Sequence, residues 1–245
     1  IVPEFESLIE QYKLYVEDDF VDYELMQVST KTSKINSIPS LIQKKYVYPQ
    51  GEEYLKLKYL FFSNMSHLFD YKKYGSQYSH FYELIRNETI NINDYNEPRK
   101  EFVIQQIQNG YLKTDSEGNI SFVNRDKILI IGYFRMYDVM SYWYFPKSIR
   151  DELDRMNEDG LVKFSDKLFT VAEQEYLDYY LNNRFSNGIW LRNKYVHATN
   201  SHDIEEQQND YKILIKLLVL VVLKIEDDLF ISKSMFTIKN GPVNY

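Results

Sequence analysis

ILIKLLVLVVL, residues 213 to 223, is the longest apolar run of the chain and decides how its C-terminal part folds. Lys216 interrupts the run, which is too short to cross a bilayer, so it predicts a buried core helix rather than a membrane segment. Upstream, Asp203 with Glu206 three residues later predicts a capping box, and we expect the helix to run to about Phe230.

Helical periodicity also dominates the rest of the sequence. In the first twenty residues the apolar side chains of Phe5, Leu8, Ile9 and Tyr12 share one helix face. Further helices are expected over residues 52–74, 76–87, 126–145, 148–159 and 172–185, with a long connection over residues 29–51.

Two short stretches predict β-hairpins. Residues 111–123 alternate around a turn at Asp115–Asn119, and residues 161–170 alternate around Ser165 and Asp166. The predicted fold class is mainly α: a helical bundle with two short inserted β-hairpins and an additional N-terminal helical region. We expect the N-terminal region to cover residues 1–125, where no motif indicates a role. A C-terminal helical domain should cover residues 126–245, with a small hairpin insertion near 160–170.

The composition limits the chemistry. The 245 residues include no cysteine, which excludes disulfide and thiolate chemistry and suits a cytoplasmic location. The net charge of −7 argues against a protein that coats nucleic acid, so RNA binding would need a local cationic patch. The sequence shows no glycine-rich phosphate loop and no metal-ligand spacing around its histidines, so we expect neither cofactor nor metal. The carboxylate clusters at residues 17–19 and 226–228 indicate solvated helix ends.

LRNKYVHATN, residues 191 to 200, precedes the long C-terminal helix and holds the candidate catalytic residues Arg192, Asn193 and His197. A histidine titrates near neutral pH, and it can take a proton from a ribose 2′-hydroxyl or give one to the leaving 5′-oxygen. The arginine offers a fork of donors to phosphate oxygens, and Asn193 could orient the phosphate or the imidazole.

The spacing of the motif restricts its geometry. Five residues of a continuous helix rotate by about 140°, which would point Arg192 and His197 to different faces. The two side chains can converge if the helix ends near Val196, or the site can be completed by the same motif of a second subunit. We expect both.

The motif has an arginine, a polar residue directly after it, and a histidine separated from the arginine by four residues. A capped apolar helix follows. This arrangement resembles the signature of the HEPN superfamily (higher eukaryotes and prokaryotes nucleotide-binding). The specific match is confined to about ten residues. The resemblance implies a helical domain that dimerises and a metal-independent endoribonuclease that cuts RNA through its 2′-hydroxyl, with no cofactor. Many members belong to bacterial toxin–antitoxin, abortive-infection and antiviral systems. The expected partners are therefore an RNA substrate, a second copy of the chain, and an antitoxin or defence-system protein. One group carries a modifiable tyrosine two residues after the histidine, where this chain has Thr199.

Three further residues are candidates for RNA binding. Lys194 and Arg184 would add positive charge for the RNA backbone, and Tyr195 would stack on a base or hydrogen-bond beside the site. The alternative for Tyr195 and Val196 is plain packing, since they lie three and four positions after Arg192.

Other interpretations stay open. Arg192 and His197 could be a surface ion-pair residue and a histidine near a helix start. The domain could be a catalytically inactive HEPN-like interaction or sensor module of a larger complex. It could also be a winged-helix regulator, because residues 148–158 and 161–170 follow the order of a recognition helix and a wing. Against this, acidic residues outnumber the two arginines of that helix and would repel the DNA phosphates.

Overall fold

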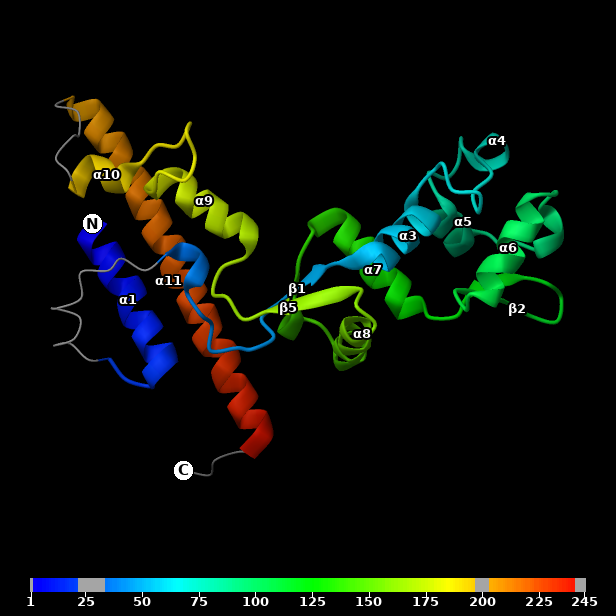
Figure 1. Ribbon diagram of the computed structural model, residues 1–245, viewed down its shortest axis with the longest axis horizontal. Helices are drawn as coiled ribbons and strands as arrows, with labels where there is room; N and C mark the ends of the chain where they lie inside the picture. Colours follow the sequence, from blue (N-terminus) through cyan, green and yellow to red (C-terminus); the bar gives the residue numbers. More distant parts are fainter. Residues whose placement is uncertain (1, 22–33, 197–202, 241–245) are drawn as a thin grey trace. The chain divides into compact units, whose positions relative to one another are not determined.

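A computed structural model describes residues 2–21, 34–196 and 203–240 of the chain (Figure 1). The described chain is mainly helical with a few short strands, which confirms the predicted fold class. It divides into two compact units, one from residues 1–46 and 165–245 and the other from residues 47–164. Each unit has its own cluster of buried hydrophobic side chains.

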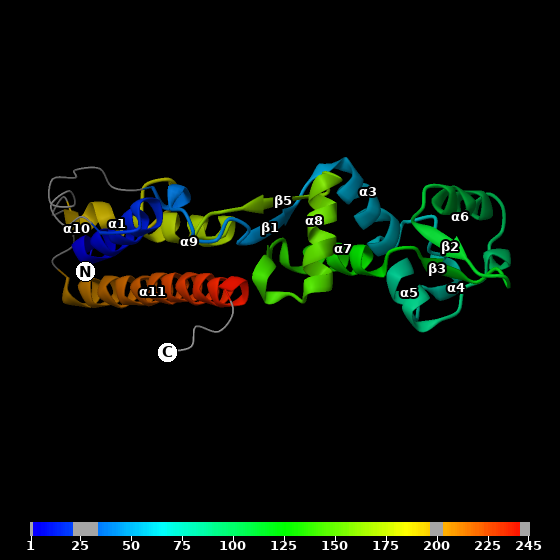
Figure 2. The ribbon, with the colours of Figure 1, turned by 90° about the horizontal axis from the view of Figure 1, so that it is seen from below.

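Helices build the first unit. Its described elements are α1 (Val2–Asp18), the 3-10 turn η1 (Ile35–Ser37), α9 (Val171–Leu181), α10 (Leu191–Val196) and α11 (Ile204–Asn240). In both views α1 lies alongside α11 (Figures 1 and 2). Leu217, Val221 and Ile225 of α11 are buried, and their spacing of four residues turns one face of the long helix towards the core.

The start of α11 agrees with the prediction, whereas its end does not. The carboxylate of Asp203 accepts the backbone N–H of Glu205 at 2.9 Å, so Asp203 caps the helix. The helix continues to Asn240, well past the expected end at Phe230. The acidic residues 226–228 therefore lie inside the helix.

A fully buried carboxylate ties three segments of the first unit together. Asp228 of α11 accepts hydrogen bonds from the hydroxyl of Ser40 at 2.5 Å and the backbone N–H of Leu41 at 2.8 Å, and also from the Tyr12 hydroxyl and the Lys45 ammonium group. Burial lowers the pKa of Lys45 from its usual range, and the charge of Asp228 opposes that effect. The interpretation of residues 226–228 as a solvated helix end was wrong for Asp228, which continues the apolar spacing of the buried face.

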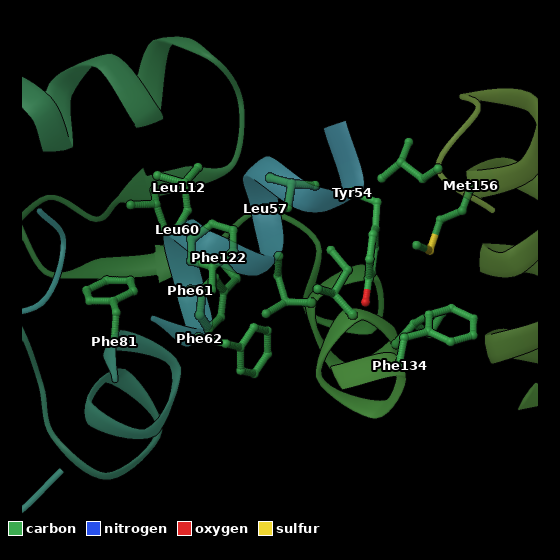
Figure 3. Close-up of a cluster of buried hydrophobic side chains, with 14 of the residues drawn as sticks. Tyr54, Leu57, Leu60, Phe61, Phe62, Phe81, Leu112, Phe122, Phe134 and Met156 are labelled. Atoms are coloured by element: carbon green, nitrogen blue, oxygen red, sulfur yellow. The ribbon is translucent and has the colours of Figure 1, made fainter. Parts of the chain in front are cut away.

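The second unit alternates short helices and strands. Its elements are β1 (Tyr46–Pro49), α3 (Gly51–Phe62), α4 (Tyr71–Tyr74), α5 (Phe81–Asn87), η2 (Ile92–Asp94), α6 (Arg99–Gln108), β2 (Leu112–Thr114), β3 (Ile120–Phe122), α7 (Arg125–Tyr137), β4 (Met140–Ser141), η3 (Tyr142–Tyr144), α8 (Lys147–Glu158) and β5 (Val162–Ser165). Aromatic rings fill its core (Figure 3), and Phe61 packs edge-to-face on Phe122 with ring centroids 5.3 Å apart.

The first predicted hairpin is confirmed. Strands β2 and β3 pair antiparallel, with Leu112 opposite Phe122 and Thr114 opposite Ile120. The Asp115 carboxylate accepts the N–H groups of Glu117 and Asn119, and Gly118 supplies the positive φ of 86° in the turn.

The second predicted hairpin is wrong. Residues 162–165 form β5, a strand of a three-stranded sheet in the order β4-β1-β5. The chain leaves the sheet after Ser165. The backbone N–H of Leu168 bonds to the carbonyl of Ile38 at 3.0 Å, and Thr170 then caps α9 in a capping box with Glu173. The stretch that would have been the wing of a winged helix is therefore one strand and a connection.

The compact units do not follow the predicted boundary at residue 125, which falls inside the second unit. Asn124 caps α7 by accepting the Lys127 N–H at 2.9 Å, and α7 packs against both α3 and α8. Residues on both sides of position 125 thus share one core.

Candidate functional site

The chain approaches α10 through a tight turn against α9. The Ile189 N–H bonds to the carbonyl of Tyr179 at 2.9 Å, and the Trp190 indole donates to the carbonyl of Phe185 at 2.8 Å. A Cβ atom at Gly188 would lie 2.8 Å from the Tyr179 carbonyl oxygen, so this close approach requires glycine. Leu191 then anchors α10 in the core with its side chain fully buried.

Arg192, on the next position of α10, faces α1. Its Nε donates to the carboxylate of Glu6, and both side chains are about one-third exposed, 32% and 31%. Beside this ion pair lies a small, largely apolar cavity of about 30 Å³, lined by Val2, Phe5, Glu6, Ile9, Ile35, Leu181, Asn182 and Arg192. Such a cavity holds no more than one or two water molecules, so a ribose phosphate would have to meet Arg192 from the solvent side.

Lys194 and Tyr195 face the start of α11. The Lys194 ammonium group lies 3.2 Å from Glu206 and 3.5 Å from Asp210, and the Tyr195 hydroxyl donates to Asp210 at 3.1 Å. Burial, followed by that hydrogen bond, raises the pKa of Tyr195 to about 12, so the hydroxyl keeps its proton and remains a donor. Two residues predicted to bind RNA thus hold α10 against α11.

Arg184 follows the C-terminal end of α9 and is also paired. Its Nη1 donates to the buried carboxylate of Asp178 at 3.1 Å, and Asn182 donates to the same carboxylate at 2.8 Å. Its other terminal nitrogen lies 3.9 Å from Glu175. Arg192, Lys194 and Arg184 are therefore each neutralised by a neighbouring acid.

The remaining predicted catalytic residues are placed only in part. Asn193 is half-buried on α10 beside Arg192. His197 lies outside the described residues, as does Thr199. The convergence of Arg192 and His197 therefore stays a prediction, while the pairing of Arg192 with Glu6 is a feature that the sequence motif did not indicate.

The described residues bear on two further kinds of feature, a metal site and a membrane-spanning helix. Within residues 2–21, 34–196 and 203–240, no cluster of three or more histidine, cysteine, aspartate or glutamate side chains is arranged to hold a metal ion. Across the same described ranges, no helix combines the length and apolar character needed to span a bilayer.

Comparisons with protein-family models, with curated proteins and with solved structures gave no match to this chain.

Proposed function

We propose that the C-terminal helices form a HEPN-like, metal-independent endoribonuclease with Arg192, Asn193 and His197 at its active site. The observation that carries the proposal is the motif itself, with its arginine and asparagine on α10 and the arginine partly open to solvent. The same resemblance suggests a cytoplasmic toxin or antiviral defence protein of bacteria, with an antitoxin or defence-system protein as a further partner.

The chemistry follows from the ordinary properties of these groups. His197 removes the proton from the ribose 2′-hydroxyl, and the 2′-oxygen attacks the adjacent phosphorus while the bond to the 5′-oxygen breaks. The same imidazole, now protonated, returns a proton to the leaving 5′-oxygen. Arg192 stabilises the negative charge that builds on the phosphate oxygens. The products are a 2′,3′-cyclic phosphate and a 5′-hydroxyl, and DNA is not cut because it lacks the 2′-hydroxyl.

The direct experiment uses the full chain and an end-labelled RNA in a buffer that contains EDTA. Wild type is expected to cleave the RNA, whereas Arg192→Ala and His197→Ala should not. An inert wild type, or variants that cleave as fast as wild type, would contradict the proposal.

Glu6 competes with the substrate for Arg192, which makes a second prediction. A partly exposed ion pair contributes at most about 1 kcal/mol. Freeing the guanidinium with Glu6→Gln should therefore raise kcat/KM for RNA cleavage by about two- to fivefold. Steady-state kinetics would measure the change.

Glu17→Gln is the matched control, since Glu17 lies on the same helix and pairs with Lys13 at 3.9 Å rather than with Arg192. An unchanged or lower kcat/KM in Glu6→Gln would show that Glu6 does not restrain Arg192.

The outward face of α11 supports a second proposal, that the chain pairs with a second copy of itself. The exposed apolar side chains of this helix are spread over its solvent-facing half: Ile204, Tyr211, Val219, Leu220, Val222, Leu223 and Phe230. Such an array is more apolar than the outside of a helix in an isolated domain usually is, and it suits packing against another helix.

The charges on the same face favour an antiparallel, two-fold pairing centred on Val219. Glu205, Lys212, Glu226 and Lys233 are exposed and lie seven or fourteen residues from Val219, so all four share its side of the helix. In an antiparallel pair with Val219 at the centre, Lys212 of one copy meets Glu226 of the other, and Glu205 meets Lys233. A parallel pair would instead set like charges side by side.

This pairing can be tested by exchanging charges. Lys212→Glu should weaken self-association by about tenfold, because it sets two acids against each other, and adding Glu226→Lys should restore it. Val219→Glu should weaken it further. Sedimentation velocity would measure the monomer–dimer equilibrium.

A wild type that stays monomeric would contradict the pairing, as would a double charge exchange that fails to recover. A dimeric wild type with no RNA cleavage would instead favour the inactive interaction module.

A further inference from the structure

A groove in the second unit gathers cationic and aromatic side chains away from the proposed nuclease site. It is an open groove of about 570 Å³ beside α3, the start of α5 and α7, and its lining includes Lys58, Tyr59, Phe62, His80 and Arg135. Phe62 (Figure 3) is fixed against α7, since a Cβ atom on Gly132 would lie 2.8 Å from its ring. Packing therefore fixes the Phe62 side of the groove, while Tyr59 and Arg135 border it from the exposed surface.

His80 is held in one orientation at the edge of this groove. Its side chain is buried, with 8% of the residue exposed, and its ring packs edge-on against Phe62 with centroids 5.3 Å apart. Its Nδ1 accepts the backbone N–H of Glu83 at 3.2 Å, which caps α5. An Nδ1 that accepts a hydrogen bond carries no proton, so in a neutral ring the proton is on Nε2.

The second ring nitrogen then faces another donor. Arg135 Nη1 lies 3.2 Å from His80 Nε2, and both atoms carry protons. Burial, and then the charge of Arg135, lowers the pKa of His80, which keeps the ring neutral and leaves it a single acceptor nitrogen. The other tautomer would accept from Arg135 but would leave the Glu83 N–H without its acceptor. In either tautomer the neutral ring has one acceptor nitrogen for two donors, the Glu83 N–H and the Arg135 Nη1–H. Only one of these two hydrogen bonds can therefore form.

The charges around this contact are unbalanced towards the positive. In the described parts of the chain, no carboxylate lies within ion-pair distance of Arg135 or Lys58, whose cations instead lie over the rings of Phe62 and Tyr54. The nearby acid, Glu83, accepts the backbone N–H and hydroxyl of Ser79 at 2.8 Å and 2.6 Å, and it keeps the negative charge that acts on Arg135 and His80. Arg135, Lys58 and Glu83 together therefore leave one net positive charge. An anion between Arg135 and His80 would accept from both donors at once and would resolve the conflict.

We propose that this groove binds the phosphate group of a small phosphate monoester of the nucleoside monophosphate type. The phosphate oxygens accept the Nε2–H of His80 and the guanidinium N–H of Arg135, with Lys58 adding charge. The organic part lies on the exposed ring of Tyr59, whose hydroxyl is fixed by a hydrogen bond to the Met65 carbonyl at 2.9 Å. This site belongs to the second unit and does not depend on the nuclease proposal.

Isothermal titration calorimetry on the full chain tests the site with three probes: adenosine 5′-monophosphate, inorganic phosphate and adenosine. We expect the monophosphate to bind most tightly, phosphate more weakly and adenosine weakest. Arg135→Gln should lower the affinity for the monophosphate about tenfold or more, because it removes a charge-assisted donor. Arg125→Gln, on an exposed residue at the other end of α7, should leave it unchanged.

His80→Asn gives a second variant that keeps a side-chain cap for α5 but removes the Nε2–H. It should also lower the affinity about tenfold. Long-range ¹H–¹⁵N spectra, with His80 assigned by comparison with this variant, should show a protonated Nε2 whose signal shifts when phosphate is added.

Absence of binding, or binding that Arg135→Gln and His80→Asn leave unchanged, would overturn the proposal. Equal affinity for phosphate and the monophosphate would overturn the part assigned to Tyr59.

Discussion

Replacing Asp228 with alanine is expected to lower the free energy of unfolding by about 3–5 kcal/mol. The variant would leave the Lys45 ammonium group buried without its counter-charge, and the Tyr12 and Ser40 hydroxyls and the Leu41 N–H would lose their acceptor. Because α1, residues 40–45 and α11 all meet at this carboxylate, the loss should appear in the unfolding of the first unit. Urea denaturation followed by circular dichroism would measure it.

Two variants make this test specific. Asp227→Ala removes the half-buried neighbouring carboxylate and should cost well under half as much. Lys45→Met with Asp228→Leu removes both charges and should recover part of the loss, since no unpaired ion is then buried. If Asp228→Ala and Asp227→Ala destabilise the chain equally, the buried cluster does not hold these segments together.

Arg192→Ala and His197→Ala are expected to lower kcat for RNA cleavage by about two to three orders of magnitude each. The arginine supplies charge stabilisation in the transition state, for which removal of one donor costs about 10² to 10³ in kcat. The histidine moves the proton, a contribution of about 10² to 10⁴. Their combined loss should be much smaller than the product of the two, because the groups act on the same transition state.

Controls separate catalysis from folding. Arg86→Ala, on the Arg86-Asn87 pair of α5 that lacks a following histidine, should cleave like wild type. Arg192→Lys keeps the charge but loses the fork of donors, and it should fall between wild type and Arg192→Ala. Variants of Arg192 or His197 that unfold at the wild-type temperature and keep full activity would show that the motif is not catalytic.

Local patterns in the sequence predicted the elements that depend on local interactions. The apolar run at residues 213–223 predicted a core helix, and Asp203 predicted its start. The alternation around Asp115–Asn119 predicted the β2–β3 hairpin, because turn chemistry and strand pairing there lie within a few residues.

Long-range pairings could not be predicted in this way. Residues 162–165 pair with β1, which is more than a hundred positions away in the sequence, so alternation alone suggested the nearer partner. The division of the chain into units depends on that same pairing and on the return of the chain through residues 165–170. Helix periodicity carries no information about either.

The candidate site shows the same limit. The motif singled out Arg192 and Asn193, but it did not indicate that Glu6 would reach Arg192 from 186 positions earlier in the chain. Asp228 is a similar case, since it was predicted to lie at a solvated helix end, and its partners Tyr12, Ser40 and Lys45 are remote in sequence. Charge pairing between distant segments needs the fold before it can be recognised.

The chemistry of the cleaved ends tests the central claim most directly. A single-site RNA would be incubated with wild type in EDTA, and both fragments would be identified by mass spectrometry. Cleavage by Arg192 and His197 predicts a 2′,3′-cyclic phosphate on one fragment and a 5′-hydroxyl on the other, with no product from the same strand carrying a 2′-deoxy sugar at the cut. A 5′-phosphate product, a requirement for a divalent metal, or an intact RNA would contradict it.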